Sequence, residues 1–389
     1  MKRIGVITTT RAEYGLLSPV IRELRKREDR DFRVELIVSG THLSPEYGMT
    51  IDEIKSTGTR IDHRIAIPVK SETPLDISNN QADALVRFTR LFSAEHYNAV
   101  ILLGDRYEML AVAIAAGNTR TPIFHLCGGD TTEGALDEWI RHSITKISYL
   151  HFVTNEESRK RVIQLGEDPA RVFDFGSTSI DNILTVADMS KHEALESVGL
   201  KDCSYALCTY HPVTMDGGGV EKQIDSFLEA VRQFPDLQFI VTKSNADQGG
   251  ARINELLDLA EKSIDNLHVF TSLGVKRYLS LMRHAEFVLG NSSSGIIETP
   301  AFHIPTVNIG NRQRGRLQSA SIVDCADDTA SIASAIQTAM SEEHKARCQN
   351  LASPYGDGHA AERIAAKSFE TVMNQTIDLR KAFYLSSRH

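Results

Sequence analysis

The sequence has few of the features that mark secreted, zinc-binding or membrane proteins. It contains five cysteines, an odd number, and none of them stands in a Cys-x-x-Cys pair, so neither a disulfide framework nor a zinc ribbon is indicated. The longest nearly unbroken apolar run, from Met109 to Gly117, has about nine residues, whereas a membrane-spanning helix needs about 20. The N-terminus lacks a long apolar signal core, and we therefore expect a cytoplasmic protein.

Two further absences concern ligands. The 389-residue chain has a formal net charge of −8 and no block of basic residues, which argues against a general affinity for nucleic acid. Residues 8–14 contain no G-x-G-x-x-G glycines, so an NAD-type dinucleotide site is not expected there. What the chain does contain is 41% hydrophobic residues, enough for a large core, and at this length two domains are expected.

Short apolar runs alternate with helical stripes along the chain. The expected strands of the first half are residues 4–9, 34–38, 99–103, 122–126, 150–153 and 172–175. Those of the second half are residues 205–209, 239–242, 268–271, 287–289 and 307–309. Because a helix between two strands returns the chain to the same edge, we expect parallel pairing. We predict an α/β protein with two Rossmann-like, doubly wound parallel-sheet domains that face a central cleft.

The strand and helix rhythm pauses near residues 176–182, where we place the domain boundary. The N-terminal domain is then residues 1–178 and the C-terminal domain residues 179–359. A long helix is expected from Ala360 to about Thr376, and residues 360–389 complete the N-terminal domain. Ligands of such domains bind at the carboxyl ends of the strands.

The stretch Gly290–Glu298 is the strongest candidate for an anion site. It follows an expected strand and opens an apolar helical stripe that reaches Ala301. The first N–H groups of that helix would favour a diphosphate, together with the hydroxyls of Ser292, Ser293 and Ser294. Glu298, about one turn further on, suits the two hydroxyls of a ribose. The alternative is a serine-rich N-cap that binds no ligand.

Charged residues follow two expected strands of the first half. Arg11 comes after residues 4–9, where it is placed to bind phosphate, and a solvated turn arginine is the alternative. Asp105 and Arg106 follow residues 99–103. An acid beside a guanidinium at the carboxyl end of a buried strand favours a site, and a structural Asp–Arg pair is the alternative.

The densest polar segment, residues 125–142, contains two adjacent glycines, which let the backbone approach a ligand closely. Carboxylates crowd its middle part at Asp130, Glu133, Asp137 and Glu138. Crowded carboxylates raise one another's pKa, so that one can hold a proton while another is ionised, as acid–base catalysis requires. A Ca²⁺ loop is the alternative, although the spacing does not match an EF-hand.

Polar loops also follow the expected strands of the second half. His211 comes after residues 205–209 and can donate a proton to a departing phosphate, with a core or capping histidine as the alternative. Residues 243–249 follow the next strand, and residues 310–316 supply three arginines after a later one. If the sheet is built as predicted, the arginine loop and the serine turn face the same crevice.

Together these segments resemble the hydrolysing UDP-N-acetylglucosamine 2-epimerases, which open bacterial sialic acid synthesis and have the GT-B fold. The similar segments keep their order over nearly the whole chain, at residues 11–14, 104–106, 128–146, 211–214, 291–298 and 310–316. The resemblance implies that UDP binds the C-terminal domain, with Ser292, Ser293, Ser294 and Glu298 at the diphosphate and ribose. It implies that Asn245 and Arg312 lie near the nucleotide. Arg11 and Arg106 would approach the phosphates or the sugar.

The implied reaction is an anti-elimination of UDP to 2-acetamidoglucal, followed by addition of water to give N-acetylmannosamine. Asp105 and Asp137 match family carboxylates of this acid–base chemistry, and His211 matches the histidine at the phosphate. The catalytic glutamate of the animal relatives falls on Cys127, whose thiol, with an ordinary pKa of about 8.5, is a poor substitute at neutral pH. Either Asp130 or Glu133 takes over that role, or the sugar pocket accepts a variant substrate.

The variant substrate would be UDP-N,N'-diacetylbacillosamine, used by members of this family in legionaminic acid synthesis, while UDP-N-acetylglucosamine is the first expectation. A GT-B glycosyltransferase and a catalytically silent UDP-sugar sensor are the alternatives from other classes, and the carboxylate density argues against the sensor. We expect a UDP-sugar as ligand, no cofactor and no metal. We also expect a homo-oligomer, a dimer or a tetramer, with no nucleic-acid or membrane partner.

Overall fold

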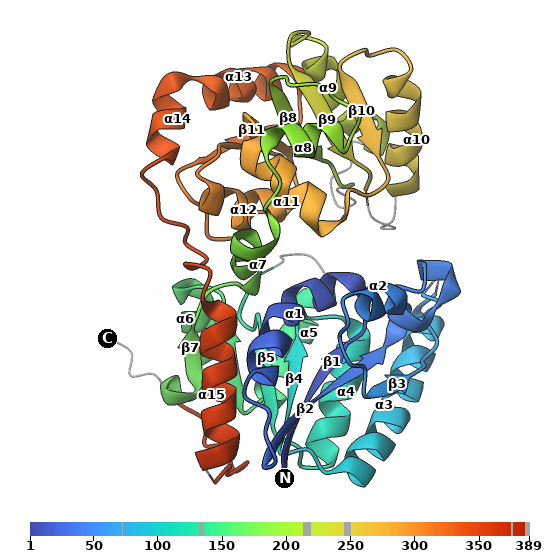
Figure 1. Cartoon of the computed structure of the whole chain (residues 1–389), viewed down its shortest axis with the longest axis vertical. Coiled ribbons are helices and arrows are strands. Elements are labelled where there is room, and N and C mark those ends of the chain that lie inside the picture. Colours follow the sequence, from blue (N-terminus) through green and yellow to red (C-terminus); the bar gives the residue numbers. More distant parts are fainter. Residues whose placement is uncertain (72, 132–135, 213–218, 245–249, 375, 386–389) are drawn as a thin grey trace. The chain divides into compact units, whose positions relative to one another are not determined.

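The computed structural model describes residues 1–389 except 72, 132–135, 213–218, 245–249, 375 and 386–389. The chain forms two compact units. Unit 1 consists of Met1–Asp181 and Gly358–His389, and unit 2 of Asn182–Asp357. Each unit is a parallel sheet covered by helices (Figure 1). The division lies between residues 181 and 182, beside the expected boundary between 178 and 179.

Unit 1 is built on a seven-stranded sheet in the order β3-β2-β1-β4-β5-β6-β7, with parallel pairing throughout. Its strands are β1 (Lys2–Thr8), β2 (Phe32–Ser39), β3 (His63–Ile65), β4 (Ala99–Leu103), β5 (Ile123–Leu126), β6 (Leu150–Val153) and β7 (Val172–Asp174). The central strands are buried on both faces, which is why they read as continuous apolar runs. The strand order reverses between β1 and β4, so the switch point of unit 1 lies there.

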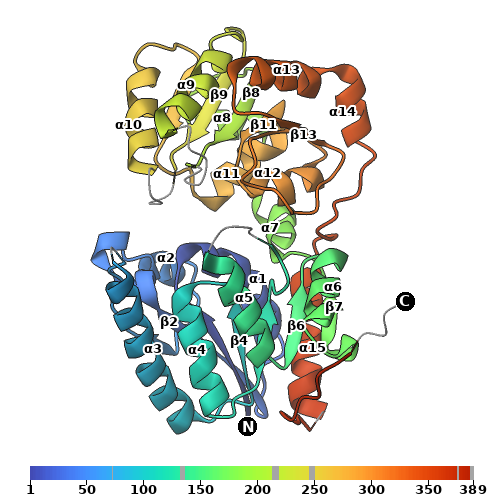
Figure 2. The same ribbon diagram turned by 180° about the vertical axis from the view of Figure 1, so that it is seen from behind.

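Helices cover both faces of this sheet (Figure 2). They are α1 (Arg11–Arg25), α2 (Ile51–Ser56), α3 (Pro74–Glu95), α4 (Tyr107–Asn118), α5 (Leu136–Ile147), α6 (Glu156–Gln164) and α15 (Ala360–Asn374), with 3-10 turns at Gly40–Leu43, Pro45–Tyr47 and Pro169–Arg171. One core cluster joins α1, α2 and α15 to the sheet, and the other joins α3, α4 and α5 to its opposite face.

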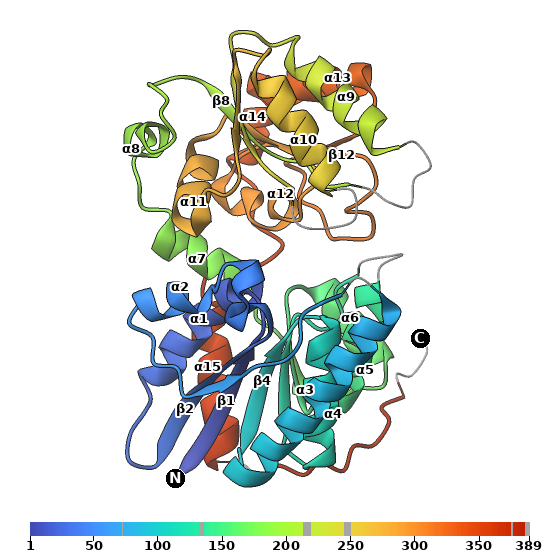
Figure 3. The ribbon, with the colours of Figure 1, turned by 90° about the vertical axis from the view of Figure 1, so that its right-hand side faces the viewer.

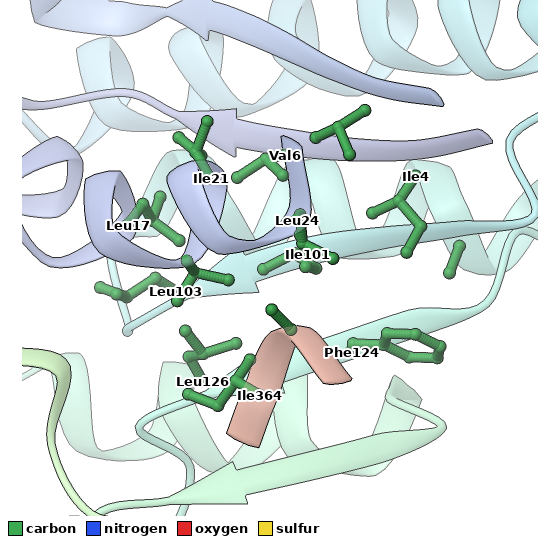
Figure 4. Packing of buried hydrophobic residues seen from close by; sticks show 14 of the residues in the cluster. Ile4, Val6, Leu17, Ile21, Leu24, Ile101, Leu103, Phe124, Leu126 and Ile364 are labelled. Atoms are coloured by element: carbon green, nitrogen blue, oxygen red, sulfur yellow. The ribbon is translucent and has the colours of Figure 1, made fainter. Parts of the chain in front are cut away.

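Helix α15 comes from the far end of the chain and completes the first of these clusters. Figure 4 shows its Ile364 among side chains of the sheet and α1. The carboxylate of Asp181 accepts the first backbone N–H groups of the helix, from Ala360 at 3.2 Å and from Ala361 at 2.8 Å. The end of unit 1's first segment thereby caps the helix that returns to it.

Unit 2 is built on a six-stranded parallel sheet in the order β10-β9-β8-β11-β12-β13. Its strands are β8 (Tyr205–Thr209), β9 (Gln238–Thr242), β10 (Leu267–Phe270), β11 (Phe287–Gly290), β12 (Thr306–Ile309) and β13 (Ile322–Cys325). The order reverses between β8 and β11, which places the switch point of unit 2 between these two strands.

The helices of unit 2 also cover both faces, with α9 and α10 on one side and α8 and α11 on the other (Figure 3). They are α8 (Lys191–Glu196), α9 (Val220–Val231), α10 (Gly250–Glu261), α11 (Gly274–His284), α12 (Ser294–Ile297), α13 (Thr329–Met340) and α14 (Glu342–Cys348), with a 3-10 turn at Thr299–Phe302. In the part of the chain that the structure describes, no helix is long and apolar enough to cross a membrane.

The prediction of doubly wound parallel α/β domains is confirmed, and every predicted strand has a counterpart. The edge strands β3 and β13 lie outside the predicted set because they are short and only partly buried, and so lack a continuous apolar run. The pause predicted at residues 176–182 is wrong, because α7 (Thr178–Val186) is a helix that runs across the division between the units.

Candidate functional site

Asn291 joins three loops at the switch point of unit 2. Its side chain is fully buried and pairs with the backbone of His211, which donates to Oδ1 at 2.7 Å and accepts from Nδ2 at 2.8 Å. The backbone carbonyl of Asn291 accepts from Arg312 Nη1 at 3.1 Å and from Gln313 Nε2 at 2.8 Å. The loops that follow β8, β11 and β12 are thereby bonded to one another.

His211 is held both by its backbone and by its ring. Its Nδ1 lies 3.1 Å from Ser244 Oγ, in the loop after β9, and the residue is only 6% exposed. The close approach of β11 to β8 depends on Gly290, because a Cβ at that position would lie 2.0 Å from the carbonyl oxygen of Thr209. His211 therefore lies at the switch edge rather than among the apolar core residues.

The serine turn differs from its prediction in length. Helix α12 is a single turn of four residues, Ser294–Ile297, and the chain continues as the 3-10 turn that contains Pro300. Proline removes a backbone donor and excludes a longer α-helix here. The predicted helix through Ala301 is therefore wrong, and an account based on the dipole of a long helix does not apply.

The hydroxyl of Ser294 donates a short hydrogen bond to Glu298 Oε2. Burial raises the pKa of Glu298 to about 7, although this hydrogen bond opposes the rise. Ser293 stands at the N-cap position, but its side chain makes no capping hydrogen bond. The alternative of a serine-rich N-cap thus fails at Ser293, but Ser292 Oγ accepts the backbone N–H of Ser294 at 3.4 Å. Ser292 and Ser293 are both partly exposed, and their hydroxyls stay candidates for ligand binding.

Of the three arginines after β12, Arg312 is the one whose side chain is bonded to the serine turn, through the Asn291 carbonyl. Arg312 is an exposed residue, so an anion in solution can approach it. Asn245, which the resemblance places near the nucleotide, lies outside the described residues. Its neighbour Ser244 is described and contacts His211.

At the switch edge of unit 1, the buried Arg141 of α5 gathers the acidic groups. Its Nη2 donates a short hydrogen bond to Asp105 Oδ2, and its Nη1 donates to the carbonyl of Asp130 at 2.6 Å and to Glu138 Oε2 at 3.1 Å. Arg141 is 3% exposed, whereas the Asp105 and Glu138 side chains are 27% and 28% exposed. Burial opposes the charge of Arg141, but Asp105, Asp130 and Glu138 together raise the pKa of the guanidinium.

Arg141 is the residue that sequence reasoning missed as a site component. A signal was present, because Arg141 follows Asp137 by four positions and Glu138 by three on one helix, which places the three side chains on the same side. The alternative of a structural Asp105–Arg106 pair is wrong. Asp105 pairs with Arg141, and Arg106 Nε instead donates to Glu108 Oε1 at 2.7 Å.

The other predicted carboxylates have different surroundings. Asp130 Oδ1 accepts from Thr154 Oγ1 and from Ser158 Oγ, both at 2.7 Å, so this side chain anchors its loop to the start of α6. Asp137 is exposed in the first turn of α5. Glu133 lies outside the described residues.

Cys127 directly follows β5 and lies in the left-handed region, with φ of 62°, a conformation that is uncommon for residues other than glycine. The two glycines that follow it serve packing within the unit. A Cβ on Gly128 would lie 3.0 Å from His125 Nδ1, and one on Gly129 would lie 2.3 Å from the Ser158 carbonyl oxygen. The sequence predicts that a ligand approaches these glycines closely. In the structure, His125 and Ser158 approach them instead.

His125 links the loop that carries Asp105 to the next strand. It is fully buried, and its Nε2 lies 2.9 Å from the carbonyl oxygen of Gly104. Burial lowers its pKa to about 3, so the imidazole is neutral and Nε2–H donates to that carbonyl. This bond holds the backbone immediately before Asp105.

The loop after β1 has both a surface ion pair and a buried acid. Arg11 Nε lies 3.1 Å from Glu53 Oε2, with the two side chains 44% and 57% exposed. Exposed pairs of this kind contribute little, so Arg11 can exchange its partner for a phosphate at small cost. Glu13, two residues later, is buried and contacts Thr9.

The described residues include no group of three or more His, Cys, Asp or Glu side chains arranged to hold a metal ion. At the switch edge of unit 1, the partly exposed carboxylates of Asp105 and Glu138 bond to the buried guanidinium of Arg141. At the switch edge of unit 2, Asn291 of the serine turn holds His211. Such groups can transfer protons and bind a phosphorylated ligand.

Known proteins resemble this chain over most of its length. A family model described as UDP-N-acetylglucosamine 2-epimerase matches residues 22–367. The GDP/UDP-N,N'-diacetylbacillosamine 2-epimerase (hydrolyzing) of Campylobacter jejuni is 39% identical over 325 residues, which cover 83% of this chain and 84% of that protein. The polysialic acid biosynthesis protein P7 of Escherichia coli is 36% identical, with coverage of 91% and 90%.

The fold has a counterpart among solved structures. The crystal structure of UDP-GlcNAc 2-epimerase from Neisseria meningitidis bound to UDP-GlcNAc matches with a TM-score of 0.80 at 20% sequence identity, covering 95% of this chain and 100% of that one. This likeness confirms the predicted GT-B-like fold.

Proposed function

The chain belongs to the hydrolysing UDP-N-acetylglucosamine 2-epimerase family, and on this premise we propose that it converts UDP-N-acetylglucosamine and water to N-acetylmannosamine and UDP. The observation that carries the proposal is the buried Arg141, which bonds to Asp105 after β4 and to Glu138 on α5. It gathers partly exposed carboxylates at the ligand-binding edge of unit 1. A protein that only binds a UDP-sugar needs no such set.

In this proposal unit 2 binds UDP. Ser292 and Ser293 donate to the diphosphate, Glu298 accepts from the ribose hydroxyls, and Arg312 and Asn245 lie at the nucleotide. The assignment is supported by the bond between Arg312 and the Asn291 carbonyl, which keeps a guanidinium beside the serine turn.

Unit 1 handles the sugar in the proposed reaction. Arg11 and Arg106 bind the phosphates or the sugar, and Asp105 and Asp137 carry the acid–base chemistry. The ion pair of Arg11 with Glu53 is exposed and therefore exchangeable for a phosphate.

The reaction has two steps. A carboxylate removes the proton from C2 while the C1–O bond breaks and its electron pair leaves with UDP, whose departing phosphate takes a proton from His211. The resulting 2-acetamidoglucal then adds water, with the oxygen going to C1 and a proton to C2. This proton enters C2 from the face opposite to the one that lost its proton, which inverts C2. The sum is UDP-N-acetylglucosamine plus water to N-acetylmannosamine plus UDP.

Cys127 occupies the position of a family glutamate. Either another carboxylate takes over the role of that glutamate, or the substrate differs. Because Asp130 Oδ1 already accepts two hydroxyl hydrogens, we assign Asp130 to the support of its loop and keep Glu133 as the candidate substitute. The second candidate function is hydrolysis of UDP-N,N'-diacetylbacillosamine. It is favoured by Cys127 and by the name of the 39% identical Campylobacter jejuni relative.

The test is incubation of the purified protein with each UDP-sugar in turn, followed by NMR of the sugars formed. We expect free N-acetylmannosamine and UDP, with ¹⁸O at C1 when the water is H₂¹⁸O and deuterium at C2 when it is D₂O. Turnover of the diacetylbacillosamine sugar alone would select the second candidate. UDP-N-acetylmannosamine as the main product, without labelled free sugar, would contradict hydrolysis.

Two alternatives from other classes are separated by the same assay. A GT-B glycosyltransferase requires an acceptor, so release of UDP with water as the sole partner argues against it. A UDP-sugar sensor binds UDP without turnover of either sugar.

A further inference from the structure

Two buried carboxylates meet at the switch point of unit 1, outside the set that the proposed reaction uses. Glu13 comes from the first turn of α1 and Glu108 from the first turn of α4, and the two residues are 4% and 3% exposed. The hydroxyl of Thr9, the residue after β1, lies 2.9 Å from Glu13 Oε2 and 3.2 Å from Glu108 Oε1. A threonine hydroxyl has one hydrogen, so it cannot donate fully to both.

The two carboxylates have unequal support. Glu108 Oε1 accepts from the Arg106 guanidinium at 2.7 Å. Glu13 has neutral donors, because its Oε2 accepts the backbone N–H groups of Thr9 at 2.7 Å and Thr10 at 3.2 Å. The donors to Glu13 all bond to Oε2. This atom remains a carbonyl oxygen that can accept them if the proton lies on Oε1.

The second oxygen of Glu13 indicates where a proton would lie. Glu13 Oε1 is buried and has no hydrogen-bond partner among the described residues, and the same holds for Glu108 Oε2. If both groups were ionised, two carboxylates would share one guanidinium in a buried place, with charged oxygens left unsatisfied. Such an arrangement is costly, and protonation of one carboxyl lowers the cost by removing one of the two negative charges.

We infer that Glu13 holds a proton on Oε1 below neutral pH and loses it above, and that it acts as a positioning residue. Its protonated form leaves Glu108 as the single counter-ion of Arg106. The role of this arrangement rests on the reaction proposed above. With Glu13 neutral, the charges of Glu108 and Arg106 cancel, and an anionic UDP-sugar meets no excess negative charge beside Arg106. Loss of the proton adds one negative charge there.

The charged and titratable neighbours are consistent with this assignment. Burial, and next the charge of Glu108, raise the pKa of Glu13 to about 7, and its hydrogen bond from Thr9 opposes the rise. His42, on the 3-10 turn after β2, has a pKa lowered by burial to about 4 and is neutral, with Nε2 at 2.9 Å from Thr8 Oγ1. Tyr107 of α4, whose pKa is raised by burial, is also neutral.

Two further arginines at this edge of unit 1 form ion pairs with other carboxylates. Arg11 is paired with Glu53 of α2, and Arg141 with Asp105. Arg106 is thus the cation that faces Glu13 and Glu108, and its guanidinium stays charged because Glu108 raises its pKa, although burial acts against this.

The first experiment detects the proton without any substrate. The protein is labelled with ¹³C-carboxyl glutamate and titrated by NMR, and infrared spectra record the carbonyl band of a protonated carboxyl. The Glu298→Gln background is used because the pKa of Glu298 is also about 7. We expect one band at pH 6 that disappears by about pH 9 and is missing in Glu13→Gln.

The outcome decides between clear alternatives. A glutamate carboxyl that titrates near 7 and is lost in Glu13→Gln supports the inference. An ionised Glu13 at pH 6, or a band that persists in Glu13→Gln, overturns it. Since Glu108→Gln removes the neighbouring charge, it should lower the pKa of Glu13, and this variant gives a second measurement if Glu13→Gln does not fold.

The second experiment tests the consequence for substrate. In the Glu298→Gln background, where Glu298 no longer titrates, KM for the UDP-sugar should rise several-fold between pH 7 and pH 9. With Glu13→Gln added, KM should stay flat at the value found at pH 6, and kcat should change little. Glu23→Gln, a change in the same helix at a side chain paired with Lys26, is the matched control. A several-fold higher KM for Glu13→Gln at pH 7 would contradict the role. Because the titration uses no substrate, failure of the proposed function and failure of this inference are distinguishable.

Discussion

The side chain of Asn291 holds the main chain of His211 in the way that a neighbouring strand would. The His211 N–H donates to Asn291 Oδ1 at 2.7 Å, and Asn291 Nδ2 donates to the His211 carbonyl at 2.8 Å. The two residues are 80 positions apart, and the contact lies beyond the last residue of β8. The amide of Asn291 therefore fixes the main chain of the histidine, while Ser244 contacts its ring.

Replacing Asn291 with alanine should leave both backbone groups of His211 without these bonds. We expect a loss of about 1–3 kcal/mol of stability and a fall in kcat of roughly tenfold or more. Asn266→Ala is the matched control, because Asn266 is also buried and donates to the Phe234 and Leu237 carbonyls at the opposite end of the sheet. Similar stability loss in both variants with equal kcat would remove the positioning role of Asn291.

Arg141→Lys tests the guanidinium that gathers the acids. A lysine keeps the charge but lacks the planar fork, and cannot bond to Asp105, to Glu138 and to the Asp130 carbonyl at once. We expect kcat to fall by roughly 10- to 100-fold in turnover assays while UDP affinity, measured by calorimetry, stays close to wild type. Arg159→Lys on α6, a partly exposed pair with Glu156, should leave both unchanged.

Asp105→Asn and Asp137→Asn separate chemistry from binding. Each should bind UDP nearly as the wild type does and lose turnover by roughly 100-fold or more, the scale of an acid–base group. Asp83→Asn on α3, which pairs with Arg87 at the surface, controls for the change of charge. If both site variants kept more than about half of the wild-type rate at saturating substrate, the carboxylate mechanism would be wrong.

Glu298 should make UDP-sugar binding depend on pH. Its pKa is raised to about 7 by burial, and the ionised form accepts ribose hydroxyls better than the protonated form. In the Glu13→Gln background, where Glu13 no longer titrates, affinity should therefore increase as pH rises from 6 to 8, and Glu298→Gln should flatten this dependence. Glu298→Ala should weaken UDP binding by roughly 1–3 kcal/mol, and unchanged affinity in calorimetry would remove the ribose assignment.

The same pKa fixes the sign of a stability effect. The pKa of Glu298 in the folded chain lies above its ordinary value of 4.5, so the folded state keeps this proton more tightly than the unfolded state does. The free energy of unfolding should fall as pH rises from about 4.5 to about 7, and should level off above it. Denaturant unfolding of wild type and Glu298→Gln between pH 5 and pH 8 measures this, and a stability difference that does not change with pH would contradict the shift.

The sequence by itself determined the architecture and the loops that carry polar groups. Continuous apolar runs alternating with helical stripes require buried parallel strands, and parallel strands present their carboxyl ends at one edge. That is why Asp105, His211 and Ser292 could be placed at strand ends without a structure. These rules use only the local pattern of side chains, so they hold before any tertiary contact is known.

Only the tertiary structure decided which groups are partners. Asp105 bonds to Arg141, 36 positions away, rather than to the adjacent Arg106, and Glu108 meets Thr9 across 99 positions. Such pairs form because strands distant in sequence lie side by side and bury their ends, so that each buried charge or hydrogen-bonding group takes the nearest available partner in space. Tertiary contacts also contribute to the short length of α12. The hydroxyl of Thr306 on β12 donates to the Gly295 carbonyl, a contact that no local propensity specifies.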